Sequence, residues 1–312
     1  MNKQKLIVLT GPTAVGKSKL SIELAKRIGG EIISADSMQV YKHMDIGTDK
    51  ISVEKMDGVP HHLIDILEPE EPFNVFLFQK LVKEAIADIS SRGKVPIIVG
   101  GTGFYIQAVL YDIDFTETDE DMTIRNELEE RASAGEKSAL FEELKAVDPK
   151  SAEIIHANNV KRVIRALEYF KKTRRPISEH NEEQHQRTSP YDFKYFVLTD
   201  DREVLYSRID KRVDLMIQEG LEDEVRSLLT RNIDRSATSM QGLGYREMIG
   251  YLDGDYDLDR AVYLIKRNTR HFAKRQLTWF RREKDVIWID KKLFGRDDAR
   301  VLEEIIRIYK DE

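Results

Sequence analysis

A glycine-rich stretch near the start of the chain has the residue types and spacing of a phosphate-binding loop. The letters GPTAVGKS match the pattern G-x-x-x-x-G-K-[ST] in full, and they stand between a short apolar run, LIVL, and a helix-like pattern. Backbone N–H groups in such a loop converge on an anion, and the N-terminus of the following helix adds positive potential. A di- or triphosphate is therefore expected to bind Gly11, Pro12, Thr13, Ala14, Val15, Gly16, Lys17 and Ser18.

Two side chains of this loop predict separate contributions to phosphate chemistry. Lys17 supplies a mobile positive charge, and the Ser18 hydroxyl is a candidate ligand for Mg²⁺. The loop identifies the anion but leaves the reaction open, because the phosphate could be transferred, hydrolysed or held while another group reacts. A P-loop hydrolase carries an apolar strand that ends in aspartate. Here the apolar run VPIIV is followed by Gly100, Gly101 and Thr102 instead.

The candidate acid of the site follows a different apolar run. Asp36 comes just after the letters EIIS, which have strand character. The carboxyl ends of parallel strands open onto the ligand crevice of an α/β protein, so Asp36 and Thr102 are both expected to face the phosphate site. Asp36 could act as a general base, cap a helix or hold Mg²⁺ through water, and its position alone leaves these alternatives open.

The elements that must position these residues alternate between strand and helix. Strands are expected at 5–10, 31–34, 61–66, 95–101, 193–198 and 285–290, and helices at 18–28, 76–91, 202–231 and 258–282. This alternation predicts an α/β fold, a P-loop NTPase-like parallel sheet flanked by helices. From residue 118 to about 185 the pattern is helical only. We therefore predict an all-helical insertion domain at 116–190 within an α/β core formed by 1–115 and 191–312.

The composition excludes several classes of protein. Of 312 residues, 41% are hydrophobic and 34% are charged, which is typical of a globular chain. The chain has no cysteine, which excludes disulfides, thiolate metal sites and cysteine nucleophiles and fits a reducing compartment. No apolar run approaches the roughly 20 residues that cross a bilayer. We expect a cytoplasmic enzyme with no membrane partner. Without a third ligand nearby, His61 and His62 predict a structural pair rather than a metal site.

Two basic islands stand out in a chain whose net charge is −6. Seven basic residues oppose one acid between 161 and 175, and nine oppose one acid between 260 and 284. Such islands suggest a localised anionic partner, although solvated helix faces are the alternative. The spacing of seven predicts one basic stripe along a helix, made of Arg260, Arg267, Lys274 and Arg281.

Beyond the loop, a series of motifs resembles the bacterial tRNA dimethylallyltransferase family, the tRNA isopentenyltransferases. The series is GPTAVGKS, ISADSMQVYKHMDIGT, PHHLID, VGGTGFY, NNVKRVIRALE, GLGYREM and AKRQLTWFRR, and it covers nearly the whole chain in the family's order. The resemblance implies transfer of a dimethylallyl group from dimethylallyl diphosphate to the exocyclic amine of the adenosine just 3′ of the anticodon in tRNA. Diphosphate then leaves intact, with the P-loop and Mg²⁺ neutralising its developing charge.

The resemblance also implies roles for individual residues. Asp36 would accept the proton of the attacking amine, Thr102 would orient the reactants, and Lys17 would hold the diphosphate. Arg212 matches a basic residue that the family places near the diphosphate, and Arg208 could share its helix face. Contacts with the anticodon stem-loop of tRNA are implied for Asp36, Ser37, Met38, Gln39, Thr102, Arg125, Lys161, Arg162, Val163, Ile164, Arg165, Gln241, Gly242, Leu243, Gly244, Tyr245 and Arg246.

The target base is stacked in the anticodon loop, so the enzyme must flip it out to reach the amine. Of the aromatic residues that could stack on a base, we expect Tyr41, Trp279 and Phe280 to lie in the core instead. Two other hypotheses remain: a small-molecule kinase that uses ATP with Asp36 as base, and a nucleotide-gated RNA-binding module without catalysis. The basic islands argue against the kinase, because binding a small substrate does not require two extended basic surfaces. We expect a monomeric enzyme.

Overall fold

The computed structural model describes residues 3–115 and 122–311. These residues form two compact units. One unit combines the chain up to Leu110 with the chain from Pro190 onward, and the other comprises Tyr111–Ser189. The second unit thus begins a few residues before the expected start at 116. No helix of the described residues is long and apolar enough to cross a membrane.

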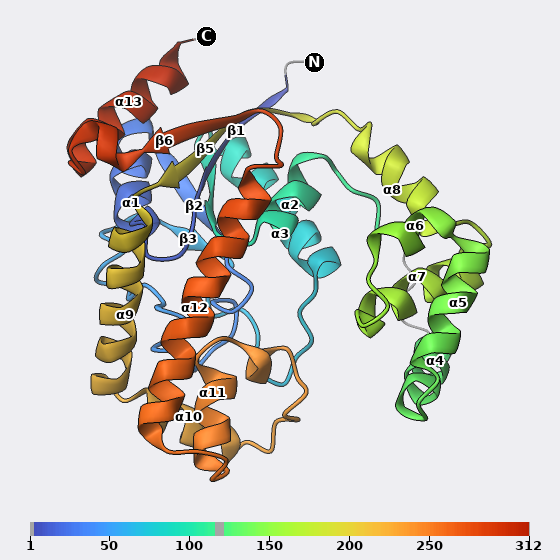
Figure 1. Cartoon of the computed structure of the whole chain (residues 1–312). Helices are drawn as coiled ribbons and strands as arrows, with labels where there is room; N and C mark the ends of the chain where they lie inside the picture. The colour runs from blue at the N-terminus through green and yellow to red at the C-terminus, as the bar shows by residue number, and fades with distance from the viewer. Residues whose placement is uncertain (1–2, 116–121, 312) are drawn as a thin grey trace. The chain divides into compact units, whose positions relative to one another are not determined.

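The first unit is built on a six-stranded sheet in the order β3-β2-β4-β1-β5-β6 (Figure 1). The strands are β1 Gln4–Thr10, β2 Gly30–Ala35, β3 His61–His62, β4 Val95–Gly100, β5 Tyr191–Thr199 and β6 Val286–Asp290. Every neighbouring pair is parallel. Their carboxyl ends therefore meet at one edge of the sheet, where ligands of such folds bind.

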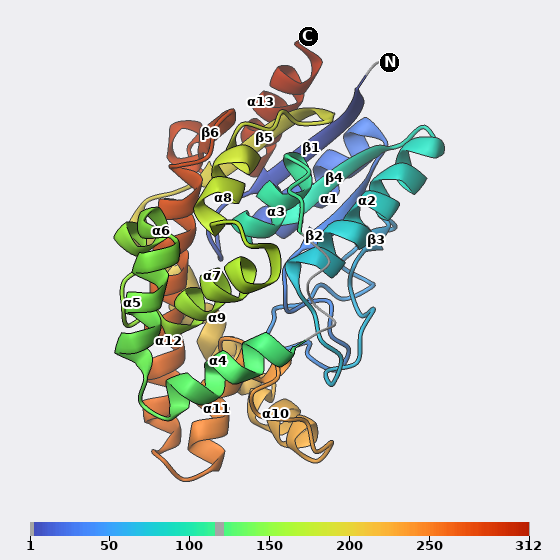
Figure 2. The ribbon, with the colours of Figure 1, turned by 90° about the vertical axis from the view of Figure 1, so that its right-hand side faces the viewer.

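Helices cover both faces of this sheet. The helices of this unit are α1 Lys17–Ile28, α2 Val75–Ser91, α3 Gly103–Leu110, α9 Arg202–Gln218, α10 Leu221–Leu229, α11 Tyr245–Leu252, α12 Leu258–Phe280 and α13 Asp298–Lys310, with 3₁₀ turns η1 Ser239–Gln241 and η2 Lys291–Phe294. Helices α1 and α13 contact each other, whereas α2 contacts α3 (Figure 1). Helices α10 and α11 lie side by side in both ribbon views (Figure 1, Figure 2).

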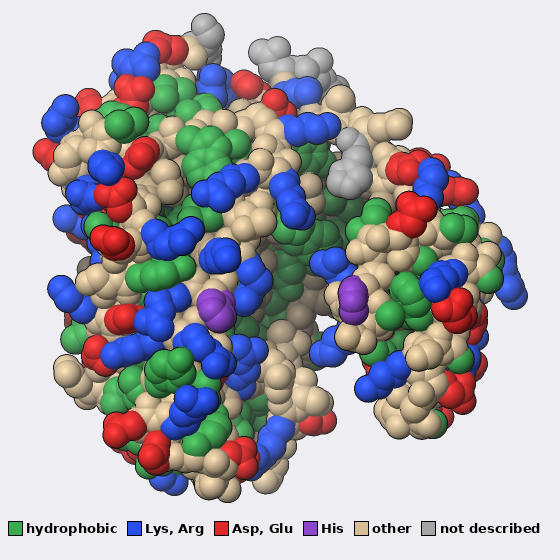
Figure 3. All heavy atoms as spheres, viewed as in Figure 1, with side chains coloured by type: hydrophobic (Ala, Val, Ile, Leu, Met, Phe, Trp, Pro, Cys, Tyr) green, Lys and Arg blue, Asp and Glu red, His purple; other side chains and the backbone are tan. Residues whose placement is uncertain are grey.

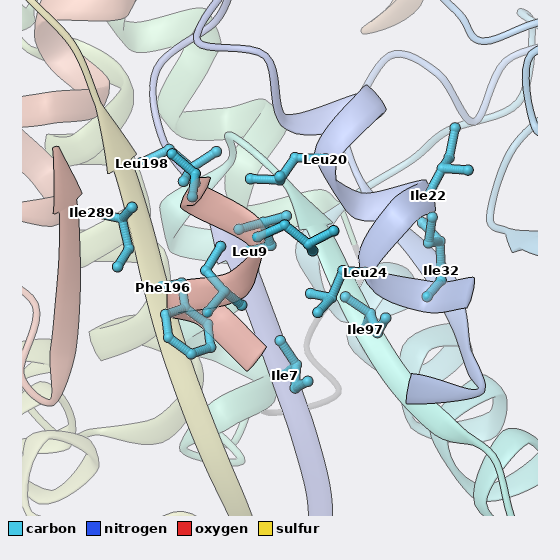
Figure 4. Packing of buried hydrophobic residues seen from close by; sticks show 14 of the residues in the cluster. Ile7, Leu9, Leu20, Ile22, Leu24, Ile32, Ile97, Phe196, Leu198 and Ile289 are labelled. Carbon is cyan, nitrogen blue, oxygen red and sulfur yellow. The ribbon is translucent and has the colours of Figure 1, made fainter. Parts of the chain in front are cut away.

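The core of the first unit explains why the apolar strand runs are continuous. Leu9 of β1 and Ile97 of β4 are fully buried, because helices cover both faces of a parallel sheet. Figure 4 shows Leu20 and Leu24 of α1 beside these strand residues. Burying a side chain of this size stabilises the fold by about 1.5–3 kcal/mol. This packing fixes the start of α1, and with it the phosphate-binding loop.

Two expected elements differ in the structure. The third strand is limited to His61–His62, because Leu63 and Asp65 have φ values of 63° and 54°, which extended chain does not allow. The helix expected at 202–231 is divided into α9 and α10 at Gly220, whose φ of 97° suits glycine. Helices α3, α11 and α13 were not expected at all.

The second unit is helical throughout its described residues. Its helices are α4 Thr123–Ser133, α5 Lys137–Val147, α6 Pro149–Ile154, α7 Val160–Thr173 and α8 Ile177–His185. Leu128, Leu140, Leu144 and Leu167 form its own apolar core. The buried Asp148 caps α6 through the Ser151 N–H at 3.0 Å, and it also accepts from the Ser178 hydroxyl at 2.6 Å. These contacts join α6 to the start of α8.

Candidate active site

The phosphate-binding loop turns sharply between β1 and α1. Gly11 has a φ of 144°, and a Cβ atom at this position would stand 2.4 Å from the carbonyl oxygen of Leu198 in β5. Any larger residue would therefore push the loop off the sheet. Ala14 and Gly16 also have positive φ, at 64° and 96°. Because Gly16 precedes α1 without a side chain, the N–H groups of the first helical turn are left available to a ligand.

Lys17 is held over the loop that contains it. Its Nζ atom donates hydrogen bonds to the carbonyl oxygens of Gly11 at 3.0 Å and Pro12 at 2.9 Å. Burial and the positive charge of Arg212 together lower the pKa of Lys17 to about 8, although the charges of Asp36 and Asp49 oppose the shift. The ammonium group is therefore poorly solvated and close to a like charge. An incoming anion would relieve both penalties.

Arg212 of α9 reaches the same loop. Its Nη1 atom donates to the Thr13 hydroxyl at 3.0 Å, and its Nη2 atom lies 3.2 Å from Oδ2 of Asp49. Arg208 lies one turn before Arg212 in the same helix. It lies 3.2 Å from Asp200, directly after β5, and does not line the cavity.

Asp36 faces the two cations, as its position after β2 predicts. It lines the same cavity as Lys17 and Arg212. Its Oδ1 atom accepts a hydrogen bond from the Met38 N–H at 2.9 Å. Burial raises the pKa of Asp36 above its ordinary value, while this N–H and the two cations oppose the rise. A carboxylate with a raised pKa in a ligand cavity is suited to accept a proton.

The cavity has a volume of about 260 Å³, and both polar and apolar side chains line it. The polar ones include Lys17, Ser18, Asp36 and Arg212. The large apolar ones, here called the apolar wall, are Ile32, Ile51, Ile64, Val99 and Phe272. Sequence reasoning did not find this apolar wall, because its members come from β2, β4, α12 and the loops after β2 and β3. A ligand with an anionic end and a short hydrocarbon end fits such a cavity.

Thr102 lies directly after the cavity lining rather than in it. Gly100 and Gly101 line the cavity, and Thr102 begins α3, where its carbonyl oxygen accepts from the N–H groups of Tyr105 and Ile106. Its neighbour Gly101 is tied to the phosphate-binding loop by Gln276 of α12. The Gln276 side chain donates to the Gly101 carbonyl at 3.0 Å and accepts from the Thr13 N–H at 2.9 Å. Gln276 is thus a site residue that the sequence indicated only as one letter of AKRQLTWFRR.

A second residue that sequence reasoning missed supports the loop from β6. Lys291 is buried, donates to the Val15 carbonyl at 3.2 Å and lies 2.6 Å from Oδ1 of Asp298. It therefore holds the turn that precedes Lys17. No motif marks Lys291, which simply follows the last strand.

The segments 36–39 and 241–246, both implied in tRNA contacts, meet in the first unit. Gly242 lies against the Met38 side chain, and Gln241 and Arg246 are exposed. The Tyr245 ring is completely buried, and its hydroxyl donates to Glu224. It cannot stack on a nucleobase in this conformation. Tyr41 and Phe280 are also completely buried, as expected.

In the second unit, the implied tRNA contacts gather around one buried acid. Glu168 accepts from Arg125 at 2.8 Å and from Lys172 at 3.0 Å, and it lies 3.4 Å from Arg165. Three cations therefore contact one buried carboxylate in this unit. The predicted contact segment 161–165 lies in α7, and its side chains differ in exposure. Lys161 and Arg162 are exposed, whereas Val163 and Ile164 are buried in the core of the unit.

Basic side chains also follow the exposed face of α12 (Figure 3). Arg260, Lys274 and Arg281 of the predicted stripe are exposed, and Arg267 is half-buried. The exposed Tyr263 ring lies 5.1 Å from the Arg260 guanidinium and 5.9 Å from that of Arg267. Two other basic residues of α12 are ion-paired with α9, since Lys266 contacts Asp214 and Arg270 contacts Asp210. Three of the four stripe residues are exposed and could meet an anionic partner.

Fold and cavity together define a P-loop-like α/β protein whose cavity combines two cations, an acid and large apolar side chains. The family model of IPP transferase matches residues 39–283, and that of isopentenyl transferase matches residues 4–66. The chain is 61% identical to the tRNA dimethylallyltransferase of Lachnoclostridium phytofermentans, over 99% of this chain and 98% of that protein. It is 54% identical to the tRNA dimethylallyltransferase of Geobacillus thermodenitrificans, over 92% of this chain and 90% of that protein.

Solved structures agree with these relatives. The tRNA isopentenylpyrophosphate transferase of Bacillus halodurans matches with a TM-score of 0.70 and 47% identity, covering 98% of this chain and 99% of that one. A eukaryotic dimethylallyltransferase acting on tRNA matches with a TM-score of 0.85 and 31% identity, covering 99% of this chain and 79% of that one. The chain belongs to the IPP transferase family. Membership supports a tRNA-modifying prenyltransferase and not the kinase that the sequence left open.

Diphosphate binding is expected to weaken as the pH rises above about 8, because the Lys17 ammonium then loses its proton. In Lys17→Arg the guanidinium stays charged. Protonation of the diphosphate itself affects both proteins equally. The ratio of their dissociation constants for inorganic diphosphate therefore reports only the deprotonation of Lys17. Calorimetric titration from about pH 7 to about pH 9.5 should show wild-type affinity falling relative to the variant, by up to about tenfold per pH unit.

A ratio of dissociation constants that stays constant across this range would show that Lys17 is not the titrating group that binds the anion.

Proposed function

We propose that this enzyme transfers the dimethylallyl group of dimethylallyl diphosphate to the exocyclic amine of the adenosine 3′-adjacent to the anticodon in tRNA. The products are isopentenyl-adenosine in tRNA and free diphosphate. The observation that carries the proposal is the lining of the cavity of about 260 Å³, which combines two cations with several large apolar side chains. The diphosphate of an allylic donor would contact the cations, and its hydrocarbon group would contact the apolar side chains.

The diphosphate end of the donor would lie against the phosphate-binding loop. In the transfer, the bond between the allylic carbon and the diphosphate oxygen breaks, and its electron pair leaves with the diphosphate. Lys17, Arg212 and the N–H groups at the start of α1 would neutralise the charge that develops there. Arg212 is already oriented for this role by Thr13 and Asp49. The wall of Ile32, Ile51 and Phe272 would exclude water from the electron-poor carbon.

Asp36 would serve the other reactant. The adenosine amine is a weak nucleophile, and the new carbon–nitrogen bond leaves it with an excess proton. Asp36 lies in the same cavity as the cations that hold the leaving group, and the Met38 N–H orients its carboxylate. The proton would pass from the amine to this carboxylate. Thr102, next to the cavity at the start of α3, is proposed to orient the flipped nucleotide.

The residues present fit a magnesium ion. Among the described residues no group of three or more His, Cys, Asp or Glu residues could hold a metal by itself. Mg²⁺ in phosphate sites needs no such group, because one or two protein oxygens together with substrate phosphates and water complete its shell. The Ser18 hydroxyl and the Asp36 carboxylate line the cavity and offer such oxygens. When bound, the ion would supply additional positive charge to the leaving diphosphate.

We propose three surfaces for the tRNA anticodon arm. The exposed Lys161 and Arg162, with Arg165 and Arg125 beside Glu168, would contact phosphates from the helical unit. The basic stripe on α12 would do so from the α/β unit, where Tyr263 adds a ring that is available for stacking. Segments 36–39 and 241–246 adjoin the cavity and are the candidates for contacting the target nucleotide and its neighbours.

Replacing Asp36 by Asn should lower kcat by about 10²–10⁴-fold, because an amide cannot accept the proton. Formation of isopentenyl-adenosine would be followed by mass analysis of nucleosides from an unmodified tRNA incubated with dimethylallyl diphosphate. Asp192→Asn is the matched control, because it makes the same change at an exposed aspartate near the amino end of β5, and it should keep the wild-type rate. A decrease of less than tenfold in Asp36→Asn would assign the base to another group.

Removing the side chains of Lys161, Arg162 and Arg165 together, each to Ala, should weaken tRNA binding. It should also reduce the slope of log affinity against log salt by about 0.7–0.9 for each phosphate contact that is lost. The dissociation constant for inorganic diphosphate should not change, because the phosphate-binding loop belongs to the other unit.

A triple variant of exposed lysines on other helices of the same unit, Lys137, Lys145 and Lys150 to Ala, removes the same charge and serves as the control. If both triple variants and the wild type gave superimposable salt plots, the α7 cluster would have no part in tRNA binding.

A further inference from the structure

One carboxylate in α10 accepts four hydrogen bonds from segments far away in the chain. Oε2 of Glu224 accepts from the N–H groups of Asp45 and Ile46, each at 2.8 Å. Oε1 accepts from the Gly47 N–H at 3.0 Å and from the Tyr245 hydroxyl at 2.7 Å. Three successive N–H groups that converge on one point form a cradle for an anion. Glu224 occupies this cradle permanently.

The segment that Glu224 holds continues into the wall of the cavity. Thr48 and Asp49 line the cavity directly after the cradle. Their carbonyl oxygens accept from the side-chain amide of Gln39, at 3.2 Å and 3.4 Å. Asp49 also lies 3.2 Å from Arg212, which in turn donates to Thr13 of the phosphate-binding loop. A continuous path of contacts therefore runs from Glu224 to the side chain that faces the diphosphate.

The fourth donor ties the cradle to α11. Tyr245 is completely buried, and Gly47 lies against its ring. Burial and the charge of Glu224 both raise the pKa of the Tyr245 phenol, so it stays protonated and donates. This explains why the aromatic residue of GLGYREM is buried: it orients the Glu224 carboxylate instead of a base.

We propose that Glu224 is a positioning residue for the transfer reaction, which fixes segment 45–49 so that Asp49 holds Arg212 against the donor diphosphate. The inference rests on the proposed function, because it assigns Arg212 to that diphosphate. The chemistry demands a carboxylate. Both Glu224 oxygens accept two hydrogen bonds each, whereas a glutamine would turn its NH₂ group toward two donors.

Glu224→Gln should lower kcat by about 10- to 100-fold, since misplacing a catalytic group by about 1 Å has an effect of this size. Glu222→Gln is the matched control, because it removes the same charge from the same helix. Glu222 pairs only with Arg226 among the described contacts of its side chain, at 2.7 Å. Its kcat should equal that of the wild type. Wild-type kcat in Glu224→Gln would overturn the proposal.

A double-mutant cycle separates positioning from a general loss of structure. If Glu224 acts through Asp49, then Glu224→Gln combined with Asp49→Asn should lower kcat no further than the more severe single variant. If the decreases in kcat of the two single variants instead multiplied in the double variant, Glu224 would not act through Asp49. Tyr245→Phe removes one of the four donors to Glu224 and keeps the Glu224 carboxylate. It therefore tests the positioning role of Glu224 if Glu224→Gln does not fold. It should lower kcat by a smaller factor, and an unchanged kcat would overturn the proposal.

Binding of inorganic diphosphate and formation of isopentenyl-adenosine together distinguish a failure of the proposed function from a failure of the role proposed for Glu224. A wild type that binds diphosphate but makes no isopentenyl-adenosine contradicts the proposed function. A wild type that makes the product, together with a Glu224→Gln variant of equal kcat, contradicts only the role of Glu224.

Discussion

The structure depends on bringing two cations, Lys17 and Arg212, to one small cavity that two acids, Asp36 and Asp49, also line. Burial of Lys17 and the repulsion between the two cations lower its pKa, although the two acids oppose the shift. Such an arrangement costs free energy in the empty protein, and a bound diphosphate offsets that cost. The site is therefore built for the charge of the leaving group, which grows as the allylic bond breaks.

Holding this arrangement requires buried polar contacts from every side of the cavity. Gln276 ties the phosphate-binding loop to the end of β4, and Lys291 supports the same loop from beyond β6. Glu224 fixes the segment that carries Asp49. Each of these side chains satisfies backbone groups of a loop, so the loops are as well ordered as the sheet that carries them. The apolar wall then limits what else can enter.

Local patterns made much of this predictable. GPTAVGKS and the apolar runs around it depend only on neighbouring residues, so the loop, five of the strands and the position of Asp36 could be predicted. Gln276 and Lys291 could not, because they contact the loop across 263 and 276 positions of sequence. The apolar wall was missed for the same reason. The sequence also could not show that the Tyr245 ring is buried, because an aromatic residue after a glycine looks the same whether it is buried or exposed.

The fate of the donor oxygen tests the central claim most directly. Dimethylallyl diphosphate that carries oxygen-18 in the bridge between carbon and phosphorus would be incubated with the enzyme and unmodified tRNA. If the cavity holds the diphosphate as a leaving group, the bond from carbon to the bridging oxygen breaks, and the released diphosphate retains all of the label in step with isopentenyl-adenosine formation. Label that stays with the organic fragment would mean cleavage between oxygen and phosphorus, and would contradict the account.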